Sequence, residues 1–152
     1  MRPAMNAENL DSTPMELAWN VAAGAFTQDV QERLQRGFAA FVDAGGVVPL
    51  ERCLRLPKSN AGVRRAQRNR WLAEVAKATD APSTWARCVA TSRVLEQFLS
   101  RGAWPAWRHL QDPPPGTSEL RVALFYTAKF NGGEGLSAKQ IRRDVGHLFK
   151  QL

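Results

Sequence analysis

The chain has 152 residues and 44% of them are hydrophobic, so one domain of this length can bury a core without disulfides or metal ions. It contains no run of about 18 apolar residues, which a membrane-spanning helix requires. Residues 1–9 are too polar for the core of a secretory signal. We therefore expect a cytoplasmic protein that makes no contact with a membrane.

Breaker residues divide the chain into short segments that mostly have helical periodicity. Residues 1–12 are polar and unpatterned, which is typical of a flexible tail, and residues 13–152 are predicted to form a single helical domain. Residues 113–116, Pro-Pro-Pro-Gly, form a stiff linker before the last two helices. The predicted fold class is all-α, a compact bundle of about six to eight short helices.

The first two helices are predicted from their start and stop signals. Ser12-Thr13-Pro14 combines a helix cap with a proline at the first helical position, and this helix would end at Gly24. The second helix would begin at Thr27 and end at Gly45-Gly46. Its apolar residues recur at helical spacing and form one stripe: Val30, Leu34, Phe38, Phe41 and Val42.

Four further helices are predicted before the linker, each bounded by proline, glycine or a capping residue. Their ranges are Pro49–Leu56, Asn60–Ala78, Ser83–Ser100 and Pro105–Gln111.

The two segments after the linker differ in how clearly they are patterned. Ser118–Phe130 suits a strand as well as a buried helix, and we predict a helix from its length and its Thr117/Ser118 cap. The last helix would begin at Ser137 and continue to the end of the chain. Its inward face would carry Ile141, Val145, Leu148 and Phe149.

The two cysteines, Cys53 and Cys88, each lie within an apolar helical pattern. That placement predicts two buried, reduced thiols, and the alternative is a disulfide or a redox role.

Charge is distributed unevenly along the chain. Residues 1–50 have a net charge of −3, residues 51–110 of +8 and residues 111–152 of +2, and the total is +7. The isoelectric point is about 10.2. A basic middle segment favours a polyanionic partner, and the alternative is a soluble protein that is simply rich in arginine.

One predicted helix begins with a dense group of cations. Arg64, Arg65 and Arg68 share an arc of about 100°, and apolar residues follow on the same arc. Because burying unpaired guanidinium groups is costly, we expect the first two turns to project beyond the core. The candidate phosphate contacts are Lys58, Arg64, Arg65, Arg68 and Arg70. The alternative is a solvated face paired with carboxylates of the N-terminal third.

The junction between the fourth and fifth helices resembles a helix-turn-helix. Ala76 is the small residue of the first helix, Asp80 stands where the turn usually has glycine, and Val89 is apolar as expected. The resemblance implies that the start of the fifth helix faces the major groove, with base contacts from Ser83, Thr84, Arg87 and Arg93. The alternative is an ordinary helical hairpin.

The C-terminal segment resembles the first two helices of a winged-helix domain, over residues 119–126 and 135–146. Only six residues follow Gly146, which is too few for a recognition helix and a wing. A second basic group with phosphate-binding potential lies here: Lys139, Arg142 and Arg143.

The sequence gives little support for base stacking by tryptophan or for catalysis. The five tryptophans are predicted to pack in the core, and the alternative is base stacking. His109 and His147 have no partners at metal-ligand spacing, and no phosphate-binding loop is present. We expect no enzymatic activity, no metal and no cofactor.

The sequence therefore predicts a nucleic-acid-binding protein, with DNA favoured over RNA and a regulator or accessory factor as the first hypothesis. Such proteins usually form homodimers, and the acidic N-terminal helices are the candidate dimer surface. A second hypothesis is a structural subunit of a larger nucleoprotein assembly. In size, helix content and basic character the chain is similar to the small subunits of CRISPR effector complexes. A third is a helical adaptor that binds an acidic protein.

Overall fold

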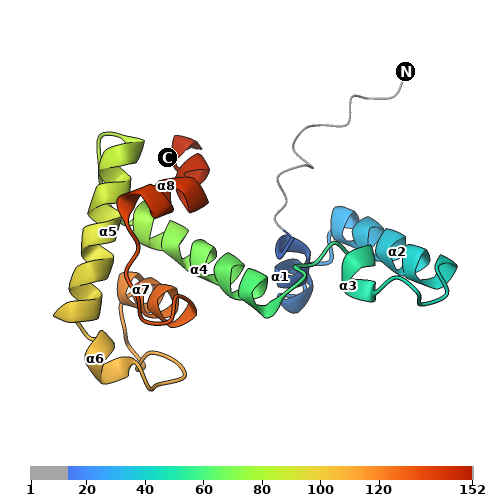
Figure 1. Ribbon diagram of the computed structural model, residues 1–152, viewed down its shortest axis with the longest axis horizontal. Helices are drawn as coiled ribbons and strands as arrows, with labels where there is room; N and C mark the ends of the chain where they lie inside the picture. Colours follow the sequence, from blue (N-terminus) through green and yellow to red (C-terminus); the bar gives the residue numbers. More distant parts are fainter. Residues whose placement is uncertain (1–13, 152) are drawn as a thin grey trace. The chain divides into compact units, whose positions relative to one another are not determined.

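Every regular element between residues 14 and 151 is helical. The computed structural model describes these residues, with eight α-helices, one 3-10 helix and no strand among them (Figure 1). The all-α prediction is confirmed, and the predicted tail, residues 1–12, lies outside the described residues. The chain divides at Val63–Arg64 into two compact units. The single helical domain over residues 13–152 stays a prediction.

The first unit contains three helices: α1 (Glu16–Ala22), α2 (Gln28–Asp43) and α3 (Leu50–Cys53). Thr27 caps α2 by accepting a hydrogen bond from the backbone N–H of Val30, as its sequence predicts. Gly37 is buried in α2, and a side chain there would collide with Leu54 after α3. The close approach of α2 and α3 therefore depends on glycine.

The predicted apolar stripe of α2 is buried only in part. Val30 is 1% exposed, whereas Phe38 is 47% and Val42 is 71% exposed. The helices that pack on α2 have only seven and four residues, so they are too short to cover the whole stripe.

The second unit contains the longer helices and nearly all of the described core. It comprises α4 (Asn60–Lys77, which begins just before the unit boundary), α5 (Thr84–Ser100), α6 (Trp104–Trp107), α7 (Glu119–Phe130), α8 (Ala138–Val145) and η2 (Gly146–Gln151). In Figure 1, α8 lies beside the first half of α5, and α6 and α7 lie near its other end. Residues 64–152 contain 15 Arg and Lys against 7 Asp and Glu, so this unit carries the positive charge of the chain.

Phe125 of α7 is the centre of an aromatic cluster in this core. Its fully buried ring lies 5.9 Å from Trp104, 6.5 Å from Trp107 and 5.2 Å from Tyr126, centroid to centroid. Tyr126 in turn stacks on Trp71 of α4 at 4.8 Å. Segment 118–130 is thus a helix rather than a strand, because its consecutive apolar residues are surrounded by α4, α5 and α6.

The end of the chain differs from the predicted single helix. The α-helix stops at Val145 and a 3-10 helix follows, so residues after Gly146 advance by about 120° each instead of 100°. Ile141, Val145 and Phe149 are buried as predicted, but Leu148 is 44% exposed.

The proline-rich linker, residues 113–116, is irregular, as predicted, and the two residues before it bond to α7. The Tyr126 hydroxyl donates a hydrogen bond of 2.8 Å to the Asp112 carboxylate, and the Lys129 ammonium donates to the carbonyl of Gln111. Partial burial and the Asp112 carboxylate both raise the pKa of Tyr126.

Both cysteines are free thiols, one in each unit. Cys88 is fully buried, and Cys53 is only half-buried. Burial raises the pKa of Cys88, and the charge of Arg142 partly offsets that effect. Between residues 14 and 151, no helix is both long enough and apolar enough to cross a membrane.

A stability prediction follows from Thr91 of α5, whose buried hydroxyl has no hydrogen-bond partner. Thr91→Val removes an unsatisfied polar group, so we expect it to raise the free energy of unfolding by about 1 kcal/mol. Thr127→Val is the matched control, because the equally buried Thr127 hydroxyl donates to the Ala123 carbonyl at 2.7 Å. Urea denaturation of both variants measures the difference. A Thr91→Val protein less stable than the Thr127→Val protein would contradict the prediction.

Tyr126 is the only tyrosine, so absorbance at 295 nm reports its ionisation alone. We expect a titration midpoint above the ordinary value of about 10, and a lower midpoint in Asp112→Asn, which removes the neighbouring negative charge. Because the folded pKa is raised, this group's contribution to stability is complete below about pH 10 and is lost as pH rises through the folded pKa. A midpoint at or below 10 in the unaltered protein would contradict the assignment.

Candidate nucleic-acid interface

The short helix α8 presents three cations on one side. Ser137 and Gln140 form a capping box, in which each side chain bonds the backbone N–H of the other, at 3.2 and 3.1 Å. Ile141 and Val145 are fully buried and fix the inward side of the helix. The residues that consequently lie exposed on the outer side are Lys139, Arg142 and Arg143.

Two contacts hold α8 against the rest of the second unit. At its start, the Ser92 hydroxyl of α5 donates a hydrogen bond of 2.6 Å to the carbonyl of Leu136. At its end, the Asp144 carboxylate accepts from the Arg68 guanidinium of α4 at 2.6 Å and from Arg143 at 3.0 Å. The helix is therefore fixed to both α5 and α4.

Arg68, a predicted phosphate contact, instead bonds to other side chains of the protein. Its side chain is 11% exposed, and that of Asp144 is 13% exposed. The guanidinium also donates to the side-chain oxygens of Asn69 and Asn131. Burial lowers the pKa of Arg68, and Asp144 partly offsets this effect by favouring the charged form. The sequence predicts an exposed Arg68, and the alternative was a carboxylate partner in the N-terminal third, whereas its partner lies in α8.

The ion pair joins the two predicted basic groups into one surface. Arg65 on α4 and Arg143 on α8 are both close enough to lower the pKa of Arg68 through repulsion. Arg143 is 71% exposed despite its contact with Asp144, and Arg65 is also exposed. We call the surface formed by Arg65, Lys139, Arg142 and Arg143 the basic face. Lys139 and Arg142 form no ion pair with any residue between 14 and 149.

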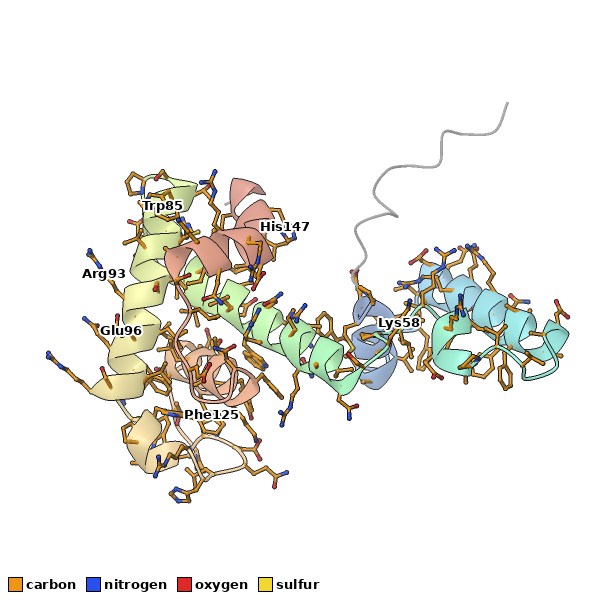
Figure 2. The ribbon with its side chains drawn as sticks, viewed as in Figure 1. Lys58, Trp85, Arg93, Glu96, Phe125 and His147 are labelled. Atoms are coloured by element: carbon orange, nitrogen blue, oxygen red, sulfur yellow. The ribbon has the colours of Figure 1, made fainter. Side chains whose placement is uncertain are left out.

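Trp85 of α5 borders the basic face. Its side chain and those of Lys139, Arg142 and Arg143 line an open pocket of about 600 Å³. Figure 2 shows Trp85 at the start of α5, near the end of the unit where α8 lies. No signal in the sequence distinguishes Trp85 from the tryptophans that pack in the core.

The residues implied by the helix-turn-helix resemblance have different environments. Ser83 caps α5 by accepting from the N–H of Ala86. Arg87 donates to the carbonyls of Ala76 and Thr79 at 2.7 and 2.6 Å, which holds the end of α4 against α5. Thr84 is half-buried, and Arg93 is exposed on the middle of α5 beside Glu96 (Figure 2).

The remaining predicted contacts are not among the described side chains that line the pocket. Arg64 is exposed at the beginning of the second unit, and Lys58 is exposed in the first unit. Arg70 lines a different pocket with Trp71, Glu74 and residues of α7, so it is on another side of α4 from Arg68. As expected, α4 buries only its later residues, which leaves Arg64 and Arg65 outside the core.

Three of the tryptophans pack as predicted. Trp71 stacks on Tyr126, and Trp104 and Trp107 contact Phe98 as well as Phe125. Trp85 differs, because it is 45% exposed and none of the ring contacts found in residues 14–149 involves it.

Within residues 14–149, no three His, Cys, Asp or Glu side chains lie together as a metal ion would need. Comparisons with family models, with curated proteins and with solved structures find no significant match for the chain.

A second stability prediction concerns the Arg68–Asp144 ion pair. Asp144→Asn leaves a buried guanidinium without its carboxylate, so we expect it to lower the free energy of unfolding by about 3 kcal/mol. Glu74→Gln is the control, since it removes the half-exposed pair with Lys77 at 2.8 Å and should cost less than about 0.5 kcal/mol. Urea denaturation compares the two. Equal losses in the two variants would show that the buried pair has no special role.

Proposed function

We propose that the protein binds nucleic acid and that the basic face contacts the phosphate backbone. The observation that carries this proposal is the exposure of Lys139 and Arg142, with no ion pair to any residue between 14 and 149, on a helix that is held at both ends. Guanidinium groups match phosphate oxygens in geometry, and a fixed row of cations releases counterions from a polyanion when it binds.

The charges around the basic face support the same partner. The carboxylate closest to it, Asp144, already accepts from two arginines and does not neutralise the remaining cations. Arg65 on α4 adds a fourth exposed cation to the three on α8, which is more positive charge than one phosphate group requires. A polymer with regularly spaced phosphates suits this extent better than an isolated anion.

The local structure of α5 favours contacts with the phosphate backbone of a nucleic acid over contacts with its bases. Ser83 and Arg87, two candidates for reading sequence, make hydrogen bonds that cap α5 and join it to α4. We therefore propose binding with little sequence preference, as in a subunit of a nucleoprotein assembly. A regulator would instead prefer one duplex sequence.

Fluorescence anisotropy with labelled random-sequence DNA and RNA, across a series of salt concentrations, tests the proposal. Replacing Lys139 and Arg142 together with glutamine removes two phosphate contacts. We expect weaker binding and a plot of log binding constant against log salt that is less steep by about 1.4 to 1.8.

The matched control is Arg101→Gln/Arg108→Gln, which removes the same charge from exposed positions at the other end of α5 and after α6. It should retain nearly full binding. No binding by the unaltered protein at 50 mM salt, or an equal loss in the two double variants, would overturn the proposal. Electrostatic binding to a polyanion is strong at about 50 mM salt, so absence of binding there is decisive.

A further inference from the structure

Trp85 is a large aromatic side chain whose position the core does not explain. It is 45% exposed, although the other three tryptophans of the second unit take part in ring contacts. Single exposed hydrophobic residues are common, so exposure alone assigns no role. What distinguishes Trp85 is its surroundings.

The pocket beside Trp85 combines one flat apolar wall with cations. Among residues 14–149, its lining consists of the indole ring and the side chains of Lys139, Arg142 and Arg143, with no carboxylate among them. The pocket is open to solvent, so it suits a ligand that lies across the surface rather than one that is enclosed. A ligand that contacts both the indole face and the cations must be planar and aromatic and must carry negative charge close to its ring. A nucleotide has these properties.

Two features favour a nucleotide within a strand. Outside the pocket, Arg65 on α4 is a further exposed cation, and its charge acts on Arg68 as that of Arg143 does. Lys139 and Arg143 lie one turn apart on α8, so they are separated by about 6 Å along the helix axis. Successive phosphates of one strand are separated by a similar distance.

The stacking surface also selects the form of the nucleic acid. In a duplex each base is covered on both faces by its neighbours, so a side chain at the surface cannot reach a base face without unstacking the helix. An unpaired base offers its face freely, and stacking on an aromatic side chain tolerates any base. The geometry therefore distinguishes single strands from duplexes.

We propose that Trp85 stacks on an unpaired base while Lys139, Arg142 and Arg143 bind the flanking phosphates, so that the protein prefers single-stranded nucleic acid. This inference rests on the proposed function of the basic face and names the form that it binds. Trp85 contributes to affinity by contacting the base, and the three cations contribute by contacting the phosphate backbone of the strand.

The experiment compares three labelled probes of about 15 nucleotides at one salt concentration. They are oligo-dT, a strand of the same charge built from abasic sites, and a duplex. We expect the unaltered protein to bind oligo-dT about 5- to 100-fold more tightly than the abasic strand. Trp85→Ala should abolish that difference without weakening the binding of the abasic strand. Trp85→Phe keeps an aromatic face and should retain part of the difference in affinity between oligo-dT and the abasic strand.

The control variant Lys139→Gln/Arg142→Gln separates the two contributions, because it should weaken binding of both single strands by a similar factor. Circular dichroism and the midpoint of thermal unfolding establish that each variant is folded. Equal affinity for oligo-dT and the abasic strand, or a preference that persists in Trp85→Ala, overturns the inference but leaves the proposed function standing. If the protein binds none of the three probes, both the inference and the proposed function are overturned.

Discussion

The ion pair between Arg68 and Asp144 is the contact on which the arrangement of α8 depends. A guanidinium and a carboxylate that are nearly removed from water must remain together, because either one alone would carry a large desolvation cost. The pair joins residues 76 positions apart and fixes the end of α8 to α4. Since Ile141 and Val145 occupy the inward side of this helix, its other side must present Lys139, Arg142 and Arg143 to solvent.

Local signals in the sequence were sufficient to predict most helix positions. Ser83, Ser118 and Ser137 cap helices where the sequence predicts them, and each accepts a backbone hydrogen bond three residues on. Capping depends on neighbours within one turn, so a linear pattern contains it. The change from α-helix to 3-10 helix at Gly146 differs from the prediction, because apolar spacing alone does not distinguish the two helix types over so few residues.

The candidate site was predictable as a set of cations but not as an arrangement. Arg65 and Arg68 are equivalent in the sequence, yet one is exposed and the other is buried against a helix that begins 70 residues later. In the same way, Arg87 and Trp85 lie two residues apart on α5, and only the packing of α4 and α8 decides which makes internal hydrogen bonds and which meets solvent. Tertiary contacts assign these roles, and no periodicity encodes them.

The placement of the two thiols gives the second unit its own chemical reporter. Alkylation of Cys88 requires the core of the second unit to open, because the sulfur is completely shielded and its raised pKa leaves little thiolate. Cys53 belongs to the first unit and is only half shielded. The rate at which a small alkylating reagent modifies Cys88 therefore measures local opening of the second unit, whereas Cys53 reacts without such opening, in a chain that needs no engineered label.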